Sequence, residues 1–129
     1  HLSIRRQRQM CIRDRDRPIL ILEDDKKLSR VMVRAIENLG FPVLSTSNPA
    51  EATKLIEDEG PNLVIVGLEN ENAGRSIFKK IKQQDEVDLL LLRSDRLDTQ
   101  TRREVQPTEV VYKPFDTRYL CRRIEDLLS

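Results

Sequence analysis

Short apolar runs alternate with longer amphipathic stretches along most of this chain. Five runs have the length and composition of β-strands: residues 18–22, 41–46, 62–66, 87–92 and 109–112. The first and third, "PILIL" and "NLVIV", are apolar almost throughout. Runs of this kind are typical of strands buried on both faces of a parallel sheet.

Apolar residues recur at helical spacing between these runs. This pattern predicts five helices, at residues 23–40, 47–60, roughly 73–84, 97–105 and 115–129. The second has the clearest start, because Asn48 is a suitable N-cap and Pro49 suits the first helical position. Gly40 and Gly60 are the expected left-handed C-caps, and Asp116 is the expected N-cap of the last helix.

The regular alternation of strand and helix predicts an α/β fold, a five-stranded parallel sheet with helices on both faces. Functional residues in such sheets lie in the crevice at the carboxyl ends of the strands. The side chains to consider are therefore those that directly follow the strands: Glu23, Asp24, Asp25, Gly67, Arg93, Ser94 and Lys113.

The composition agrees with a cytoplasmic protein of one domain. The chain has 129 residues, of which 38% are hydrophobic and 35% charged. No apolar run approaches the roughly 20 residues that span a bilayer, and no secretory signal is visible. Cys11 and Cys121 have no metal-ligand spacing and suggest no disulfide framework, so a reducing compartment is expected.

Residues 1–17 differ from the rest because they are rich in arginine and lack periodicity. They are predicted to be a disordered or artefactual basic leader, since "RRQRQMCIRDR" resembles a translated sequencing-adapter fragment. A basic arm that binds nucleic acid is the functional alternative. The leader is expected to be dispensable for stability, and the domain is expected to span residues 18–128.

Three segments, taken together and in order, point to a known family. "ILILEDD" at the first strand, "PNLVIVG" at the third and "YKPF" after the fifth resemble the receiver domain of bacterial two-component response regulators. The resemblance covers essentially all of residues 18–128. It implies a flavodoxin-like (β/α)5 fold and a role in phosphorelay signal transduction.

The resemblance assigns a metal site and a phosphoacceptor. Two acids after the first strand hold Mg²⁺ in the family, and they correspond to Glu23 and Asp24, with Asp25 just beyond. An aspartate after the third strand accepts the phosphoryl group, and Gly67 stands at that position. No aspartyl phosphate can form on glycine, and Mg²⁺ binding is expected to be weak or lost without the third carboxylate. Gly67 is also expected to allow a backbone conformation that aspartate tolerates less well.

The phosphate-sensing positions are altered as well. A hydroxyl after the fourth strand is replaced by Arg93, with Ser94 one residue later, while Lys113 keeps the lysine that pairs with the phosphoryl group. The family's Lys-Pro bond, here Lys113–Pro114, is usually cis. Two alternatives stay open for Arg93, which either supplies a permanent positive charge to Glu23 and Asp24 or points into water.

A second sensing position is altered too. Val110 occupies the family's aromatic switch position, and Tyr112 is expected to pack against a helix.

These departures predict a pseudo-receiver that is not an enzyme, requires no cofactor and acts through protein–protein interaction. Its expected partners are a histidine kinase, an output domain or another receiver, with a homodimer as one form and nucleic acid reached only through a lost output domain. The expected interaction face carries Arg102, Arg103, Arg118, Arg122 and Arg123. The alternative is an active phosphoacceptor that uses Glu69 or Asp25.

Overall fold

The computed structural model describes residues 17–68, 71–84 and 86–129, with the backbone alone at 71–73. Within these ranges five parallel strands form one sheet in the order β2-β1-β3-β4-β5. The strands are β1 (Ile19–Leu22), β2 (Val43–Thr46), β3 (Leu63–Val66), β4 (Asp88–Arg93) and β5 (Glu109–Tyr112). The predicted fold class is confirmed.

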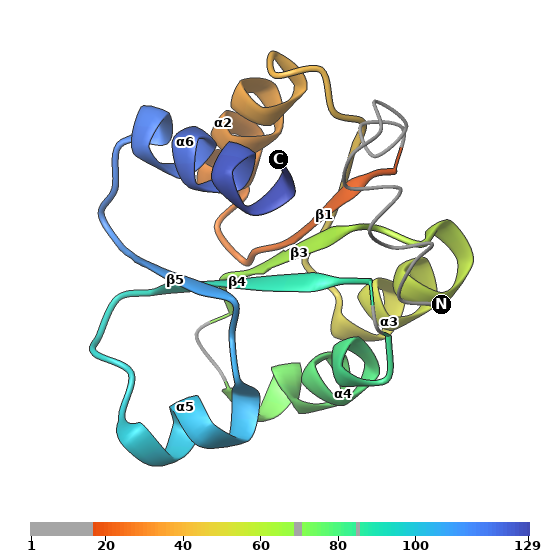
Figure 1. Ribbon diagram of the computed structural model, residues 1–129, viewed down its shortest axis with the longest axis vertical. Coiled ribbons are helices and arrows are strands. Elements are labelled where there is room, and N and C mark those ends of the chain that lie inside the picture. The colour runs from red at the N-terminus through yellow and green to blue at the C-terminus, as the bar shows by residue number, and fades with distance from the viewer. Residues whose placement is uncertain (1–16, 69–70, 85) are drawn as a thin grey trace.

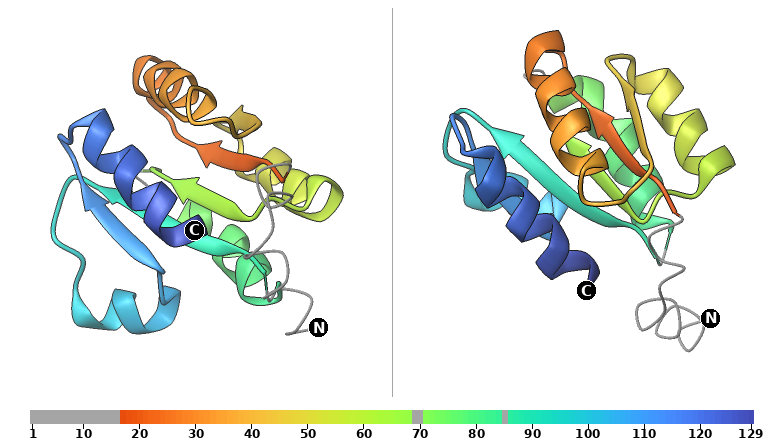
Figure 2. Two further views of the ribbon diagram at one scale, coloured as in Figure 1. Left: turned by 45° about the horizontal axis from the view of Figure 1, so that its top comes forward. Right: turned by 90° about the horizontal axis from the view of Figure 1, so that it is seen from above.

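Helices cover both faces of this sheet (Figure 1). They are α2 (Lys26–Glu37), α3 (Pro49–Glu59), α4 (Glu71–Lys82), α5 (Thr99–Val105) and α6 (Thr117–Leu128). Helices α2 and α6 lie next to each other on one face, as Figure 2 shows, and α3, α4 and α5 lie on the other.

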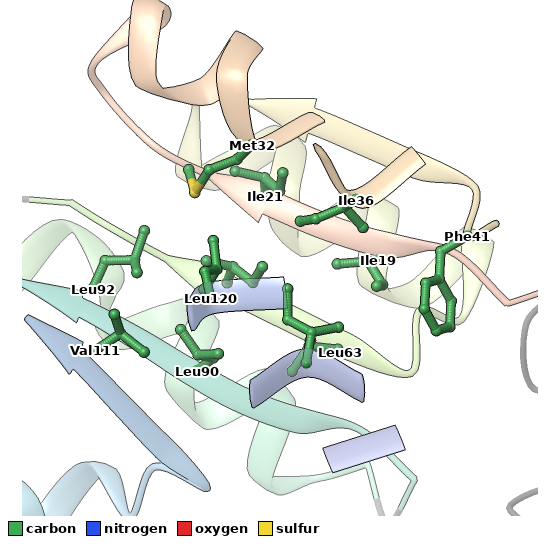
Figure 3. Close-up of a cluster of buried hydrophobic side chains, with 12 residues drawn as sticks. Ile19, Ile21, Met32, Ile36, Phe41, Leu63, Leu90, Leu92, Val111 and Leu120 are labelled. Carbon is green, nitrogen blue, oxygen red and sulfur yellow. The ribbon is translucent and has the colours of Figure 1, made fainter. Parts of the chain in front are cut away.

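The period-two geometry of the strands divides the core into two halves. In β1, Ile19 and Ile21 pack with the helices α2 and α6, whereas Leu20 and Leu22 pack with α3, α4 and α5. Figure 3 shows the first half, where Met32 of α2 and Leu120 of α6 lie over the sheet. All four β1 residues are fully buried, which explains why the sequence of this strand is apolar without alternation.

Most of the predicted helix ends are confirmed, with one correction. Asn48 accepts hydrogen bonds from the Ala50 and Glu51 amides, and Gly60 ends α3 in the left-handed region at φ 56°. Asp116 caps α6 as predicted. Gly40 has a φ of 97°, but it is not the cap of α2, which ends at Glu37 with Asn38 as its right-handed C-cap. The turn after α2 therefore needs Gly40, and the helix end itself does not.

The boundary of the leader shifts by one residue. Residues 1–16 lie outside the described residues, but Arg17 is bound to the body of the domain. Its guanidinium donates to the carbonyls of Gly60, Pro61 and Glu86, and it pairs with the Glu86 carboxylate at 3.6 Å. Arg17 therefore belongs to the folded domain rather than to the leader. None of the helices in the described ranges is long and apolar enough to cross a membrane.

Candidate functional site

The carboxyl ends of four strands converge at one edge of the sheet, as the parallel topology requires. Backbone hydrogen bonds hold these ends in register: the Gly67 amide donates to the Leu22 carbonyl at 2.8 Å, and the Lys113 amide donates to the Arg93 carbonyl at 2.6 Å. The residues that follow β1, β3 and β5 are therefore neighbours in space. The structure brings Glu23, Gly67 and Lys113 together, as predicted.

Glu23 is the centre of this arrangement. It is only 2% exposed, and one of its carboxylate oxygens, Oε1, forms an ion pair with Lys113 Nζ at 2.7 Å. Its other oxygen, Oε2, accepts the Asp24 amide at 2.8 Å and the Asp25 amide at 3.4 Å. A buried carboxylate requires such partners, because its desolvation is otherwise costly.

Gly67 makes room for that carboxylate. A Cβ atom at residue 67 would lie 2.7 Å from Glu23 Oε1 and 3.0 Å from Oε2, closer than non-bonded contact allows. Gly67 is not among the residues with a positive φ, so the expectation of a special backbone conformation is wrong. The glycine is needed here for space, and the atoms that fill the space belong to Glu23.

Lys113 joins both residues. Besides its ion pair with Glu23, its Nζ atom lies 3.5 Å from the Gly67 carbonyl oxygen, and its side chain is largely buried. The Lys113–Pro114 peptide bond is cis, as the resemblance implies. The lysine to which the resemblance assigns the phosphoryl group is thus paired with a carboxylate of the same chain.

Arg93 has a different neighbour from the one expected. It is the last residue of β4 rather than the first after it, and its guanidinium pairs with Asp95 at 3.0 Å. Its side chain is 15% exposed, so the alternative that it points into water is wrong, and the cation next to Glu23 is Lys113. A recess of about 210 Å³ lies here, lined by Gly67, Leu68, Leu92, Arg93, Ser94, Asp95 and Lys113.

The acids at the end of β1 have separate roles. The carboxylate of Asp25 is the N-cap of α2, where it accepts the Lys27 amide at 3.0 Å and the Leu28 amide at 3.2 Å. Asp24 is exposed. In the parts of the chain that the structure describes, no group of three histidine, cysteine or acidic side chains is arranged to hold a metal ion. Glu23 faces Lys113 and Asp25 caps a helix, so these two carboxylates do not fit a Mg²⁺ site in this arrangement, and Asp24 is the remaining acid of the three.

The predicted interaction face lies around the edge strand β5, with α5 on one side of the sheet and α6 on the other (Figure 1). Arg102, Arg103, Arg118 and Arg122 are exposed. Arg123 is half-buried, and it pairs with Glu109 of β5 and with Asp126. Its hydrogen bond and charge contact with Glu109 raise its pKa above the ordinary value.

Tyr112 is 41% exposed on the same face, and it lines a surface recess together with Thr99 and Arg102 of α5, which agrees with the expectation that it lies against a helix. Because side chains alternate along a strand and Val111 faces α2 and α6, Tyr112 faces the side of the sheet that α5 covers. Tyr119 of α6 is exposed as well, at 47%. Val110, at the expected switch position, is half-buried and packs with the core half under α3, α4 and α5.

Sequence reasoning placed Glu23, Gly67 and Lys113 at one edge but missed their direct contact. One signal was available, because a lysine at the end of β5 that finds no acid at the end of β3 is left with the acid at the end of β1, the next strand along the sheet. Glu69, the other proposed acceptor, lies outside the described residues.

Comparisons with known proteins agree with this fold. The chain is 26% identical over 113 residues to the probable transcriptional regulator ycf27 of Porphyridium aerugineum, covering 85% of this chain and 47% of that protein. The chain thus spans about half the length of this relative.

Two of the similar solved structures have the same fold. The chemotaxis protein CheY4 of Vibrio cholerae matches with a TM-score of 0.77 at 17% identity, covering 88% of this chain and 99% of that one. The receiver domain of the sensor histidine kinase PA1611 of Pseudomonas aeruginosa, solved with a magnesium ion in its active-site cleft, matches with a TM-score of 0.71 at 21% identity, covering 88% and 97%.

The family model of the response regulator receiver domain matches residues 19–125, which is most of the chain. This match includes the strand ends that carry Glu23, Gly67 and Lys113. The chain therefore belongs to the response regulator receiver domain family.

Proposed function

We propose that this receiver domain works without being phosphorylated, as a pseudo-receiver that acts through protein–protein contacts. Receiver domains interact with histidine kinases and output domains, and this chain keeps the scaffold for such contacts. On this proposal the domain is not an enzyme, needs no cofactor and works in the cytoplasm.

The observation that carries the proposal is the position of the Glu23 carboxylate. It fills the space above Gly67 and pairs with Lys113 at 2.7 Å. A phosphoryl group bound at this edge would need that lysine and that space. The Glu23 carboxylate is instead a permanent negative charge in this space, so the positive charge of Lys113 is balanced without a phosphoryl group.

Phosphorylation of Asp25 is the less favoured alternative. Its carboxylate is held by two amides at the start of α2, and the dipole of the helix stabilises its negative charge. A carboxylate held in this way would have to release its cap before it could attack a donor. Glu69 lies outside the described residues, so only the phosphorylation experiment tests whether it accepts a phosphoryl group.

Incubation with acetyl phosphate and Mg²⁺, followed by intact mass measurement, tests the proposal. We expect no addition of a phosphoryl group under conditions that modify a receiver domain that retains its aspartate. A base-labile adduct that maps to Glu69 or Asp25 would overturn the proposal in favour of the alternative.

The face around β5 is the proposed contact surface. It combines exposed arginines with two exposed tyrosines, Tyr112 and Tyr119, and aromatic and arginine side chains dominate the energetics of many interfaces. Sedimentation of the wild type and of Tyr119→Ser shows whether a second copy is the partner. A dimer that the substitution dissociates identifies this face as a homodimer surface, and a monomer in both cases directs the search to a kinase or output domain.

A further inference from the structure

The space between α4, α5 and the sheet contains a cavity that the receiver chemistry does not use. Its volume is about 230 Å³, and it is lined by the ends of β3 and β4 and by side chains of both helices. Both helices cover the same face of the sheet (Figure 1). We propose that this cavity binds a small organic anion with a flat apolar body, such as an aromatic carboxylate.

The walls are suited to an apolar body. They are formed by Val66, Leu68, Phe78, Leu91 and Val105. Gly74 contributes to the close packing on the α4 side, because a Cβ atom there would lie 3.2 Å from the Phe78 ring. The ring of Phe78 can therefore lie against α4 and leave the cavity open.

The rim of the cavity carries an excess of positive charge. Three exposed cationic side chains line it, namely Arg75, Lys79 and Lys82, against a single described acid, Glu104, while Arg93, which also lines it, is paired with Asp95. Lys82 donates to the backbone carbonyl of Glu104, which connects the end of α4 to α5. No described carboxylate lies within ion-pair distance of Arg75 or Lys79.

Size and charge together define the ligand class. Sites for drug-sized ligands occupy about 300–1,000 Å³, so a cavity of this volume fits a smaller molecule of one or two rings. An apolar floor below a cationic rim favours a molecule with its negative group at one end. A neutral analogue would lose the electrostatic attraction of the cationic rim. A larger polyanion would have to place charged groups against the apolar walls.

Such a ligand would act on the proposed contact face. The cavity is bounded by Thr101 and Val105 of α5, and the opposite side of this short helix carries the exposed Arg102 and Arg103. A bound molecule would bridge α5 to α4 and the sheet. Ligand binding would thus hold α5 in one position, which is an input independent of phosphorylation and of the identity of the partner.

Titration of the full chain with 2-naphthoate, followed by amide chemical shifts in NMR spectra, tests the proposal. We expect saturable shifts concentrated at Leu68, Phe78 and Val105, with a dissociation constant of about 1 mM for a ligand of about 13 non-hydrogen atoms. 2-Naphthamide, which has the same rings and no charge, should bind about two- to fivefold more weakly. Equal affinity for both compounds would overturn the anion specificity.

Matched variants localise the binding. Thr101→Phe places a ring in the cavity and should abolish binding, whereas Gln100→Phe on the exposed side of the same helix should not. Lys79→Gln should weaken 2-naphthoate binding about two- to fivefold, and Lys54→Gln, on the exposed face of α3, should leave it unchanged. Absence of saturable binding, or binding that Thr101→Phe leaves intact, would overturn the proposal.

Discussion

The Glu23 carboxylate occupies the position where a side chain at residue 67 would begin. Glu23 Oε1 lies 2.7 Å from the Cβ position of Gly67 and, in the same arrangement, 2.7 Å from Lys113 Nζ. Glu23 follows β1, Gly67 follows the adjacent strand β3, and Lys113 follows β5, which is two strands from β3 in the sheet. These three residues thus form one interdependent unit. Changing any of the three should change the energetics of the others.

The first prediction concerns Gly67→Ala. The added methyl group must displace the buried Glu23 carboxylate from its ion pair, so the free energy of unfolding should fall by about 1–3 kcal/mol. Urea denaturation measures this change. The same substitution in a Glu23→Ala background should cost much less, because the colliding group is gone. Equal costs in both backgrounds would show that Glu23 does not determine the space at residue 67.

A second prediction separates the ion pair from its parts. Lys113→Met leaves the Glu23 carboxylate buried without its cation and should lower the free energy of unfolding by about 3 kcal/mol. The double variant Glu23→Gln/Lys113→Met should be more stable than Lys113→Met, since the glutamine oxygen can still accept the Asp24 amide. If the double variant is the less stable of the two, the pairing at 2.7 Å contributes little.

Local sequence signals predicted the fold well where they act within a few residues. Asn48 and Pro49 begin α3 and Gly60 ends it, because capping and backbone freedom are properties of the local chain. Gly40 was less informative, since a turn of two further residues separates it from the end of α2. The burial of β1 followed from its unbroken apolar run.

The candidate site was predictable in position and less so in pairing. The strand order places Glu23, Gly67 and Lys113 together, but which cation reaches Glu23 depends on side-chain directions that no pattern encodes. Arg93 is the last residue of β4 and turns to Asp95, only two residues away. The length of the lysine side chain then decides that Lys113 reaches Glu23.

The third prediction is a pH dependence. The Thr101 amide, which donates to the Asp98 carboxylate at 2.7 Å, lowers the pKa of Asp98 at the start of α5. Because the folded pKa is below the unfolded value of about 3.9, the stabilisation is present above that pH and is lost as the pH falls through the folded pKa. Urea midpoints at pH 6 and pH 3 should therefore differ more for the wild type than for Asp98→Asn. An identical difference in both would show that the cap does not contribute.

The fourth prediction places the boundary of the domain at Arg17. Arg17→Ala removes three hydrogen bonds to the carbonyls of Gly60, Pro61 and Glu86 and should lower the free energy of unfolding by about 1–3 kcal/mol. Removal of residues 1–16 alone should leave it nearly unchanged. Thermal unfolding of the two truncations, starting at residue 17 or at residue 18, measures the difference. Equal stability of the two truncations would show that Arg17 does not stabilise the domain and belongs with the leader.

The final prediction asks what would restore phosphoryl chemistry. Gly67→Asp alone should accept little phosphoryl group from acetyl phosphate, because the new side chain competes with Glu23 for the same space. It also adds a second carboxylate beside that of Glu23, and the two negative charges then have to share the single cation Lys113.

Gly67→Asp with Glu23→Asp should accept more, since the shorter acid withdraws from residue 67 and remains available to Mg²⁺. Arg93→Thr supplies the missing hydroxyl, but it does not free the space, so with Gly67→Asp it should help less than the change at Glu23. Phosphoryl incorporation and Mg²⁺ affinity in the three variants provide the comparison. If Gly67→Asp alone reacts as readily as an ordinary receiver, then the Glu23 carboxylate moves at little cost, and the site lacks only its nucleophile.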